Sequence, residues 1–333
     1  MADFYLCERL GETRVAVVEA GTLVEMHLAR IGDGLPAGSR VSARLSRKLG
    51  GRGVAILPSG EEAIIEPWPA GISEGAAIDV QIQRAAWREP GRSRLAKARL
   101  AKARLTEARP AWDAVPILSV QERLTAAGHA LCPGWPDSLA AQWDDGWEAA
   151  LLGRVLLPTG TLGFTPTPAL VAVDVDGTGA TLALDAARAA ARTIRLWGLG
   201  GAIVIDFPAS ADKAARLALA AAFDSAMGGA PFERTAVNGF GLMQIVCPRP
   251  GPSILERARL EPHANAGQEL LAAALAETRP GAITLVARPS VAAWLASHPA
   301  LLADLARKTG RAVDVRADPA IESNGGSGHV ETR

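Results

Sequence analysis

The chain has 333 residues, with 35 acidic and 35 basic side chains and therefore a formal net charge of zero. Hydrophobic residues make up 49% of it, which is ample for packed cores, and the length suggests about two domains of roughly 150 residues each. Proteins that bind nucleic acid through a global basic field are more cationic than this. Binding to nucleic acid would therefore depend on a local basic patch or on a metal-bridged phosphate.

The three cysteines, Cys7, Cys132 and Cys247, are widely spaced and form no CxxC pair. This pattern predicts neither a disulfide framework nor a cysteine zinc site, and it fits a reducing compartment. The first residues lack a basic leader followed by an apolar core, and the apolar stretches are too short to span a bilayer. We therefore expect a cytoplasmic protein without a membrane segment.

Residues 1–90 are predicted to form a small β barrel of the OB type. Two strands are expected around the turn at Glu19-Ala20-Gly21, where the glycine can adopt a positive φ. Further short strands, separated by glycine and proline turns, are expected at residues 40–45, 54–57, 63–66 and 77–83. Several short strands at close spacing are typical of a small closed barrel.

A basic repeat with a period of five residues occupies residues 91–109. Five residues advance a helix by about 500°, so Leu95, Leu100 and Leu105 would not stay on one helix face. We favour a solvated helix or linker, and the alternative is an arm that contacts RNA phosphates. In that alternative the contacts would be Arg94, Lys97, Arg99, Lys102 and Arg104.

Four tryptophans lie within or beside the connecting segment, at positions 112, 135, 143 and 147. Trp143 and Trp147 would share one face of a helix. Packing in a core is the favoured role for them, and stacking on bases is the alternative.

Residues 151–253 contain the pattern of a βαβ unit. An apolar strand at 169–173, an alanine-rich helix at 182–197 and a second apolar strand at 202–205 follow one another, so the two strands should be parallel and adjacent or nearly so. Beyond them, residues 254–333 are predicted to form a small α/β appendage. Its elements are expected as a helix at 254–277 with a possible break near Pro262, a strand at 282–286, a helix at 291–309 and a strand at 312–315.

Two aspartates, Asp174 and Asp206, each follow a strand of the βαβ unit. Parallel strands would bring both carboxylates to one edge of the sheet, where ligands bind in open α/β sheets. Asp176 would project to the same side as Asp174. Three converging carboxylates repel one another, and Mg²⁺, which prefers oxygen ligands, would offset that repulsion. Alternatively, aspartates in such places cap a helix or fix a turn, and their spacing does not decide between the two roles.

Several blocks of the sequence resemble the ribonuclease E/G family. IRLWGLGGAIVIDF at 194–207 is similar to the family's LRLRDLGGxIVIDF, and FGLMQIVCPRPGPS at 240–253 is similar to FGLxEMxRxRxxPS. The block at 157–179 resembles LPSGGxIxIxxTEALxxIDVNSG, and the stretches at 11–30 and 72–86 resemble parts of the family's opening hairpin and OB barrel.

This resemblance implies a Mg²⁺-dependent endoribonuclease acting on single-stranded RNA. Asp174 and Asp206 match the family's two metal-binding catalytic aspartates, Asp176 stands where the family has an asparagine that orients the site, and Arg249 matches a basic residue facing the RNA. The fold class implied is α+β, with an OB-type barrel, an α/β nuclease core of the ribonuclease H-like or DNase I-like kind, and a C-terminal appendage. The domain ranges are 1–90 for the barrel, 91–150 for a basic linker and reduced connecting segment, 151–253 for the core and 254–333 for the appendage.

The chain also departs from the family pattern. Two family glutamates are replaced by Pro168 and Gln244, and one family arginine is replaced by Cys247. Ala55 and Ile65 stand near the positions of the barrel aromatics that stack on RNA. The pocket that senses a 5′ monophosphate and the cysteine zinc link are not evident. We therefore expect no zinc-linked tetramer, and a homodimer is left open.

Two alternative functions remain. The lost glutamates, arginine and aromatics fit an RNA-binding protein with weak or no catalysis. The motif DVDGT at 174–178 also resembles haloacid-dehalogenase-type phosphatases, in which Asp174 would be the nucleophile and Asp176 the acid/base. That family has a downstream GDxxxD motif, which this sequence lacks.

Overall fold

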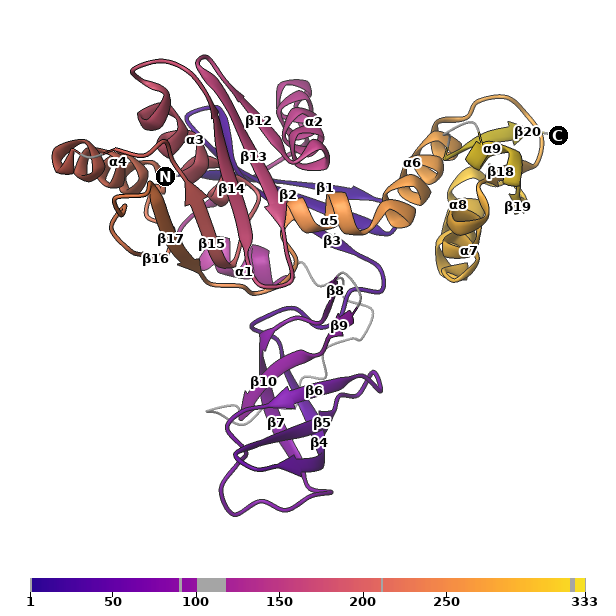
Figure 1. Ribbon diagram of the computed structural model, residues 1–333. Helices are drawn as coiled ribbons and strands as arrows, with labels where there is room; N and C mark the ends of the chain where they lie inside the picture. Colours follow the sequence, from indigo (N-terminus) through magenta and orange to yellow (C-terminus); the bar gives the residue numbers. More distant parts are fainter. Residues whose placement is uncertain (1, 90–91, 101–117, 211, 324–326, 333) are drawn as a thin grey trace.

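The computed structural model describes residues 2–89, 92–100, 118–210, 212–323 and 327–332, and it has a mixed α+β architecture. A closed barrel of five strands, a six-stranded sheet backed by helices, a four-stranded N-terminal sheet and a three-stranded C-terminal sheet make up most of it. Figure 1 shows the barrel and the C-terminal lobe as two projections from the body that contains the six-stranded sheet. Among the described residues, no helix has both the length and the apolar character needed to cross a membrane.

The N-terminal strands form a sheet of their own instead of joining the barrel, so the structure differs here from the barrel expected at residues 1–90. Strands β1 (Asp3–Arg9), β2 (Glu12–Glu19) and β3 (Thr22–Arg30) are antiparallel, and β11 (Ala130–Cys132) adds to β1 in parallel. The physical reason is that β2 is buried on both faces. Val15 and Val17 pack in one small cluster with Phe4, whereas Ala16 packs in the main core.

The barrel consists of five strands: β4 (Arg40–Leu49), β5 (Arg52–Ile56), β6 (Glu62–Ile65), β7 (Ala77–Arg84) and β10 (Ala96–Leu100). Four of them lie where the sequence predicts strands. They close in the order β10-β6-β5-β4-β7, with β10 parallel to β6 and antiparallel to β7. The inward-facing side chains form a separate apolar core that includes Leu45, Val80 and Ile82.

The basic repeat contributes strands, so the expectation of a helix or linker at 91–109 is wrong for its first part. Strands β8 (Trp87–Glu89) and β9 (Arg92–Arg94) form a small hairpin, and β10 closes the barrel. Within β10 the small residues Ala96 and Ala98 point into the barrel, whereas Lys97 and Arg99 alternate with them on the outside. This alternation has the period of a strand. Lys102 and Arg104 lie outside the described residues.

The six-stranded sheet has the order β12-β13-β14-β15-β17-β16. Its strands are β12 (Arg154–Leu157), β13 (Gly160–Pro166), β14 (Val171–Gly177), β15 (Gly201–Asp206), β16 (Glu233–Arg234) and β17 (Leu242–Cys247). Helix α3 (Leu182–Leu196) joins β14 to β15, and these two strands are parallel neighbours, which confirms the predicted βαβ unit. The buried residues of α3 are mostly alanines, so the helix lies close against the sheet.

Helices α2 (Asp137–Leu152) and α4 (Lys213–Ala226) complete this body, and α1 (Leu118–Ala126) lies beside the N-terminal sheet. The predicted core role of the tryptophans is confirmed for those in α2. Trp143 is 1% exposed and contacts Trp135 edge-on, and Trp147 packs against the same core. Trp112 lies outside the described residues.

The C-terminal segment forms an α/β lobe, as the sequence predicts. Helices α5 (Ile254–Leu260) and α6 (Pro262–Ala276) are separated at Pro262, where the break was expected. The single helix expected at 291–309 is two helices, α7 (Pro289–Ala296) and α8 (Pro299–Thr309), because Pro299 has no N–H for an ongoing helix and starts a new one. The remaining elements are β18 (Ile283–Ala287), β19 (Val313–Ala317), α9 (Pro319–Ser323) and β20 (Gly328–Thr332).

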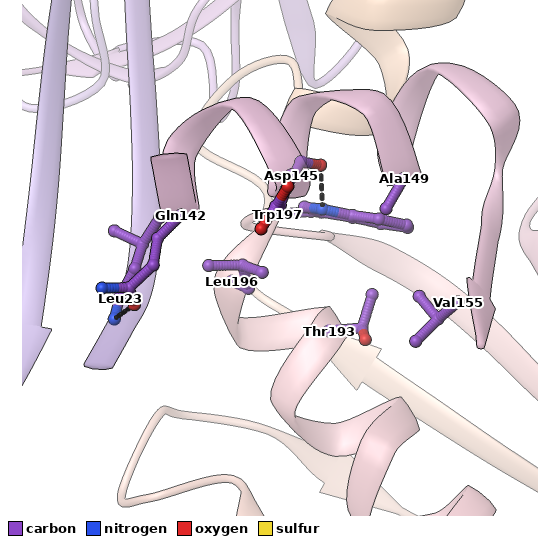
Figure 2. Close-up of a pocket in the computed structure, with 9 residues that line it drawn as sticks. Leu23, Gln142, Asp145, Ala149, Val155, Thr193, Leu196 and Trp197 are labelled. Carbon is purple, nitrogen blue, oxygen red and sulfur yellow. Dashed lines mark hydrogen bonds between the residues drawn. The ribbon is translucent and has the colours of Figure 1, made fainter. Parts of the chain in front are cut away.

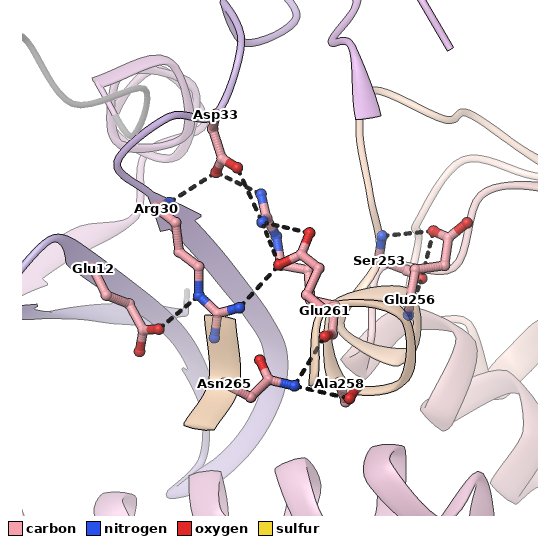
Figure 3. Close-up of polar contacts among 9 residues, drawn as sticks. Glu12, Arg30, Asp33, Ser253, Glu256, Ala258, Glu261 and Asn265 are labelled. Atoms are coloured by element: carbon pink, nitrogen blue, oxygen red, sulfur yellow. Dashed lines mark hydrogen bonds and ion pairs between the residues drawn. The ribbon is translucent and has the colours of Figure 1, made fainter. Parts of the chain in front are cut away.

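A network of charged residues joins the N-terminal sheet to α5 and to the start of α6 (Figure 3). Arg30 Nε donates to Glu12 at 2.9 Å, and its Nη1 donates to Glu261 at 2.9 Å. Arg257 donates to Asp33 at 2.6 Å and to Glu261 at 3.3 Å. The side chains of both arginines are almost fully buried, so each depends on the carboxylates around it.

A second cluster attaches α3 to the first hairpin. Arg195 donates to Glu19 and Glu25 at 2.5 and 3.1 Å, and His27 lies 3.1 Å from Glu25. Burial raises the pKa of Glu25, but the bonds and charges of His27 and Arg195 outweigh it and lower the pKa from 4.5 to about 2. Glu25 therefore stabilises the fold as a carboxylate.

Replacing Arg257 by methionine should lower the free energy of unfolding by about 3 kcal/mol, because Asp33 and Glu261 would keep their charges without this cation. Urea unfolding followed by circular dichroism measures the change. Arg279→Met is the matched control, since Arg279 forms an exposed ion pair with Glu277 and its loss should leave stability almost unchanged. Equal effects of the two substitutions would contradict the role given to the network.

The stability that Glu25 contributes should be lost at acid pH. Because its pKa falls from 4.5 to about 2 on folding, the contribution is complete above pH 4.5 and disappears as pH falls toward 2. Unfolding free energies of the wild type and Glu25→Gln should therefore differ most above pH 4.5 and converge below it. A difference that stays constant over this range would show that Glu25 does not act through its charge.

Candidate functional site

Asp174 and Asp206 are direct neighbours across two parallel strands. Asp174 lies within β14, Asp206 is the last residue of β15, and the two are partners in the strand register. Adjacent strands lie about 4.8 Å apart, so the two carboxylates start from backbone positions at that separation. The sequence placed both residues after their strands, whereas β14 continues to Gly177.

Both aspartates point away from the core. Along β14 and β15 the side chains of Val173, Val175 and Ile205 are buried in the core behind the sheet, whereas Asp174, Asp176 and Asp206 are exposed on the opposite side. We call this side of the sheet the open face. The alternation follows directly from the two-residue period of a strand.

Asp176 shares the open face but does not complete a three-carboxylate cluster. It lies two residues along β14 from Asp174, a rise of roughly 6.7 Å, and its partner on β13 is Thr161. Within the described residues no group of three or more His, Cys, Asp or Glu side chains could hold a metal ion. The expectation that all three carboxylates converge is therefore wrong, and the close pair is Asp174 with Asp206.

The structure supports no capping or turn-forming role for these aspartates. Within the described part of the chain, the side chains of Asp174, Asp176 and Asp206 form no hydrogen bond and no ion pair. By contrast, Asp212 caps α4 by accepting from the backbone N–H groups of Ala214 and Ala215 at 2.9 and 3.3 Å. The pair on the open face consists of two adjacent, uncompensated negative charges.

An arginine lies on the same line across the sheet. Arg154 on β12 pairs with Gly163 on β13, which pairs with Asp174, and Asp174 pairs with Asp206. Gly163 has no side chain, and a Cβ there would come no nearer to its surroundings than 3.9 Å from the Cβ of Asp174. Arg154 is exposed, and no described residue forms an ion pair with it. Sequence reasoning missed Arg154, although the hairpin turn before Gly160 would have given its register.

Two glycines hold β13 tightly against β14 beside the site. Gly160 and Gly177 are register partners, and a Cβ on Gly160 would lie 2.1 Å from the carbonyl oxygen of Asp176. A Cβ on Gly177, whose φ is 146°, would lie 2.3 Å from the carbonyl oxygen of Thr159. Only glycine fits this crossing, which accounts for both glycines in the segment 157–179.

The basic residues predicted to contact RNA are partly occupied elsewhere. Arg249 forms an ion pair with Glu256 and lies 4.5 Å from the ring centre of Trp87. These contacts hold the β8–β9 hairpin near the start of α5. Lys97 pairs with Glu66 at 2.7 Å, and Arg99 donates to Gln81 at 3.3 Å. The side chain of Arg94, like Lys102 and Arg104, lies outside the described part.

A different basic surface appears on the barrel. The β4–β5 hairpin exposes five cationic side chains: Arg40, Arg44, Arg47, Lys48 and Arg52. The sequence gives this signal as alternation within β4, where Val41, Ala43 and Leu45 face the barrel interior. Ala55 and Ile65, which stand near the family's stacking aromatics, are completely buried.

One cavity lies behind the sheet and does not include the aspartate pair. It has a volume of about 260 Å³, and Figure 2 shows it between α2, α3 and β3. Its lining is largely apolar and includes Leu23, Val155, Leu196 and Trp197. Val155 packs on the core side of β12, opposite the open face. The aspartate pair lies on the other side of the sheet, where both side chains are exposed.

Comparison with known families gives the decisive result for this region. Residues 140–249 match the model of the ribonuclease E/G family, and this match contains Asp174, Asp206, Arg154 and Arg249. This match covers about a third of the chain and supports its membership of the ribonuclease E/G family. It matches no curated protein.

The departures from the family pattern can now be placed. Gln244 is exposed on the open face, opposite Val204 of β15. Cys247 points into the core on the other side of β17, and burial raises the pKa of its thiol to about 11. The thiol therefore stays neutral and cannot replace an arginine as a phosphate ligand.

If the aspartate pair is kept for function, removing either charge should not destabilise the fold. Asp174→Ala and Asp206→Ala should leave the unfolding free energy unchanged or slightly higher, because like charges directly opposite one another across two strands repel. Asp212→Ala should cost about 1 kcal/mol by removing the α4 cap. A loss as large for Asp174→Ala as for Asp212→Ala would show that Asp174 has a structural role.

Proposed function

We propose that this ribonuclease E/G family member is an endoribonuclease that hydrolyses phosphodiester bonds of single-stranded RNA, with Asp174 and Asp206 holding a Mg²⁺ ion. The observation that carries the proposal is the pair of in-register, unpartnered carboxylates on the open face, inside the segment that matches the family. Family membership points to an endoribonuclease, and the arrangement of this pair supplies the reason for a metal.

The donor set fits Mg²⁺. This ion usually binds proteins through one or two carboxylates and completes its shell with water and substrate phosphate oxygens. Asp174 and Asp206 offer two carboxylates, and no described residue forms an ion pair with either of them. When bound, the ion would polarise a phosphoryl oxygen and lower the pKa of an attacking water.

The neighbouring side chains would position the substrate. Arg154 lies across Gly163 from Asp174, and its guanidinium could hold the oxygens of a phosphate through two parallel hydrogen bonds. Asp176, one pair of residues further along β14, can accept a hydrogen bond from the attacking water and orient it. These roles separate phosphate binding from water orientation along the same face.

RNA binding away from the cut would fall to the barrel. Its strand order, with the last strand parallel to the third, supports the proposal of an OB-type barrel, a fold that binds oligonucleotides. The exposed cations of the β4–β5 hairpin would track the RNA backbone. The α/β body behind the aspartate pair would then be the nuclease core. In this proposal the enzyme acts in the cytoplasm, where its cysteines stay free, and it forms no zinc-linked tetramer.

The open face favours a polymer over a small phosphomonoester. Small-molecule substrates usually bind in concave sites that bury most of their surface. The aspartate pair instead lies on a sheet surface, where an extended strand can pass across Arg154 and both carboxylates. The exposed position of the pair therefore favours the ribonuclease over the phosphatase alternative.

Asp174→Asn and Asp206→Asn should each abolish cleavage while RNA binding survives, because the amides keep the shape of the site and remove the charge that holds the metal. The assay is cleavage of an end-labelled, A/U-rich single-stranded RNA with Mg²⁺, with chelator, and with Mg²⁺ restored. Cutting by the wild type should stop with chelator and return with the metal.

Asp144→Asn is the matched control, because Asp144 is an exposed carboxylate on α2 that is 77% accessible and lies outside the site. It should cut at the wild-type rate. If the wild type binds the RNA but does not cut it under any metal condition, the protein is a binding member of the family that has lost catalysis.

A further inference from the structure

Phe240 is the one aromatic side chain that is exposed among the residues the structure describes. It is 82% exposed, and the other five phenylalanines are buried or packed against a core. The described tryptophans and Tyr5 are likewise buried or partly buried. Leaving a phenylalanine ring in water forgoes about 2 kcal/mol of burial, so its position calls for a physical reason.

The turn that carries Phe240 is firmly held. The side-chain oxygen of Asn238 accepts from the N–H groups of Phe240 and Leu242 at 2.9 and 3.0 Å. The backbone of Asn238 also bonds to that of Gly241 and Leu242, at 3.2 and 3.0 Å. The ring is therefore presented by a well-bonded turn and not by a loose loop.

This turn lies at the end of β15, beside the aspartate pair. Leu242 is the register partner of Asp206, and Phe207 donates to the carbonyl oxygen of Gly241 at 3.1 Å. Gly241 has a φ of 93°, and a Cβ on it would lie 2.0 Å from the carbonyl oxygen of Phe207. Phe240 precedes Leu242 by two residues, so the turn places it next to the end of β15 that carries Asp206.

We propose that Phe240 stacks on a nucleobase next to the scissile phosphate and so fixes which bond of a single-stranded RNA lies over Asp174 and Asp206. This inference rests on the proposed function. Every base has a flat π face, so one exposed ring can hold a nucleotide without reading its sequence. The proposal also accounts for the chain's lack of exposed aromatics on the described barrel, where Ala55 and Ile65 are buried.

The arrangement implies a direction across the sheet. Arg154 lies on one side of the aspartate pair, and the Phe240 turn lies on the other, beyond β15. An RNA strand that crosses the open face would have one phosphate near Arg154 and the aspartate pair. The base next to that phosphate would stack on Phe240. A fully paired duplex cannot offer that base, so the site should select unpaired RNA.

The test measures stacking directly, without Mg²⁺ so that the RNA stays intact. A set of short single-stranded RNAs carries 2-aminopurine at successive positions, and its fluorescence reports stacking. Phe240→Ala should weaken binding about tenfold and abolish quenching at one position, because stacking of one base accounts for a change of this size. Phe240→Tyr should retain both, and an abasic nucleotide at that position should weaken the wild type but not Phe240→Ala.

Leu217→Ala is the matched control, since Leu217 is an apolar residue on α4 that is 59% exposed, and it should bind like the wild type. Binding and quenching by Phe240→Ala equal to those of the wild type would overturn the inference. Wild-type binding and quenching by Phe240→Leu would also overturn it. So would a change from dimer to monomer in Phe240→Ala, because the ring would then belong to a contact between two protein chains.

These outcomes are separable from those for catalysis. If the wild type and Phe240→Ala cut RNA equally well and at the same bonds, the proposed ribonuclease activity is supported and the role of Phe240 is rejected. If quenching depends on Phe240 but no metal condition produces cutting, base stacking by Phe240 is supported and the proposed catalysis is rejected.

Discussion

The rest of the fold depends on the buried charge network that joins residues far apart in the chain. Arg30 ends the first hairpin, and Glu261 lies 231 positions later, between α5 and α6. Arg257 completes the link by binding Asp33 and Glu261 together. The side chains of both arginines are almost fully buried, so loss of the carboxylates would leave a buried positive charge without a partner. This group of ionic bonds joins the first and last thirds of the chain, which also share apolar cores.

This attachment matters for the site because the first hairpin and α5 pack into the same apolar core. Ala16, Leu23 and Met26 come from the first hairpin, and Leu255 and Ala258 come from α5. The buried side of the six-stranded sheet packs between them. With its core side filled in this way, the sheet can leave its other face bare and keep strand register across β12 to β17. The chemistry of the open face is a consequence of the packing behind it.

The open face combines features that would be unfavourable for stability alone. Two carboxylates are held side by side without a cation, an arginine has no described partner, and a phenylalanine ring lies in water. Under the proposed function, each of these features would become favourable when a metal ion, a phosphate or a base is bound. Their occurrence together on one surface, within the family segment, is stronger evidence for an RNA-cleaving surface than any one of them.

The barrel illustrates how a composition signal can mislead. The basic repeat suggested a solvated helix because its leucines recur every five residues. In the structure Ala96 and Ala98 fill the barrel interior, and the charged residues between them face outward. The strand was selected by a vacant edge between β6 and β7, which no local pattern reveals. A further set of exposed cations, which was not predicted from the sequence, lies on the β4–β5 hairpin.

The sequence by itself determined the βαβ unit, the burial of Trp143, the helix break at Pro262 and the identity of the aspartate pair, because these depend on local periodicity, proline chemistry and short motifs. Tertiary structure alone decided that the first hairpin joins the core, that Arg249 holds Trp87, and that Arg154 faces Asp174 across Gly163. It also decided that Phe240 is left exposed beside Asp206. These outcomes depend on strand register and on contacts between residues that are far apart in the chain. Both are fixed only when the strands and helices pack together.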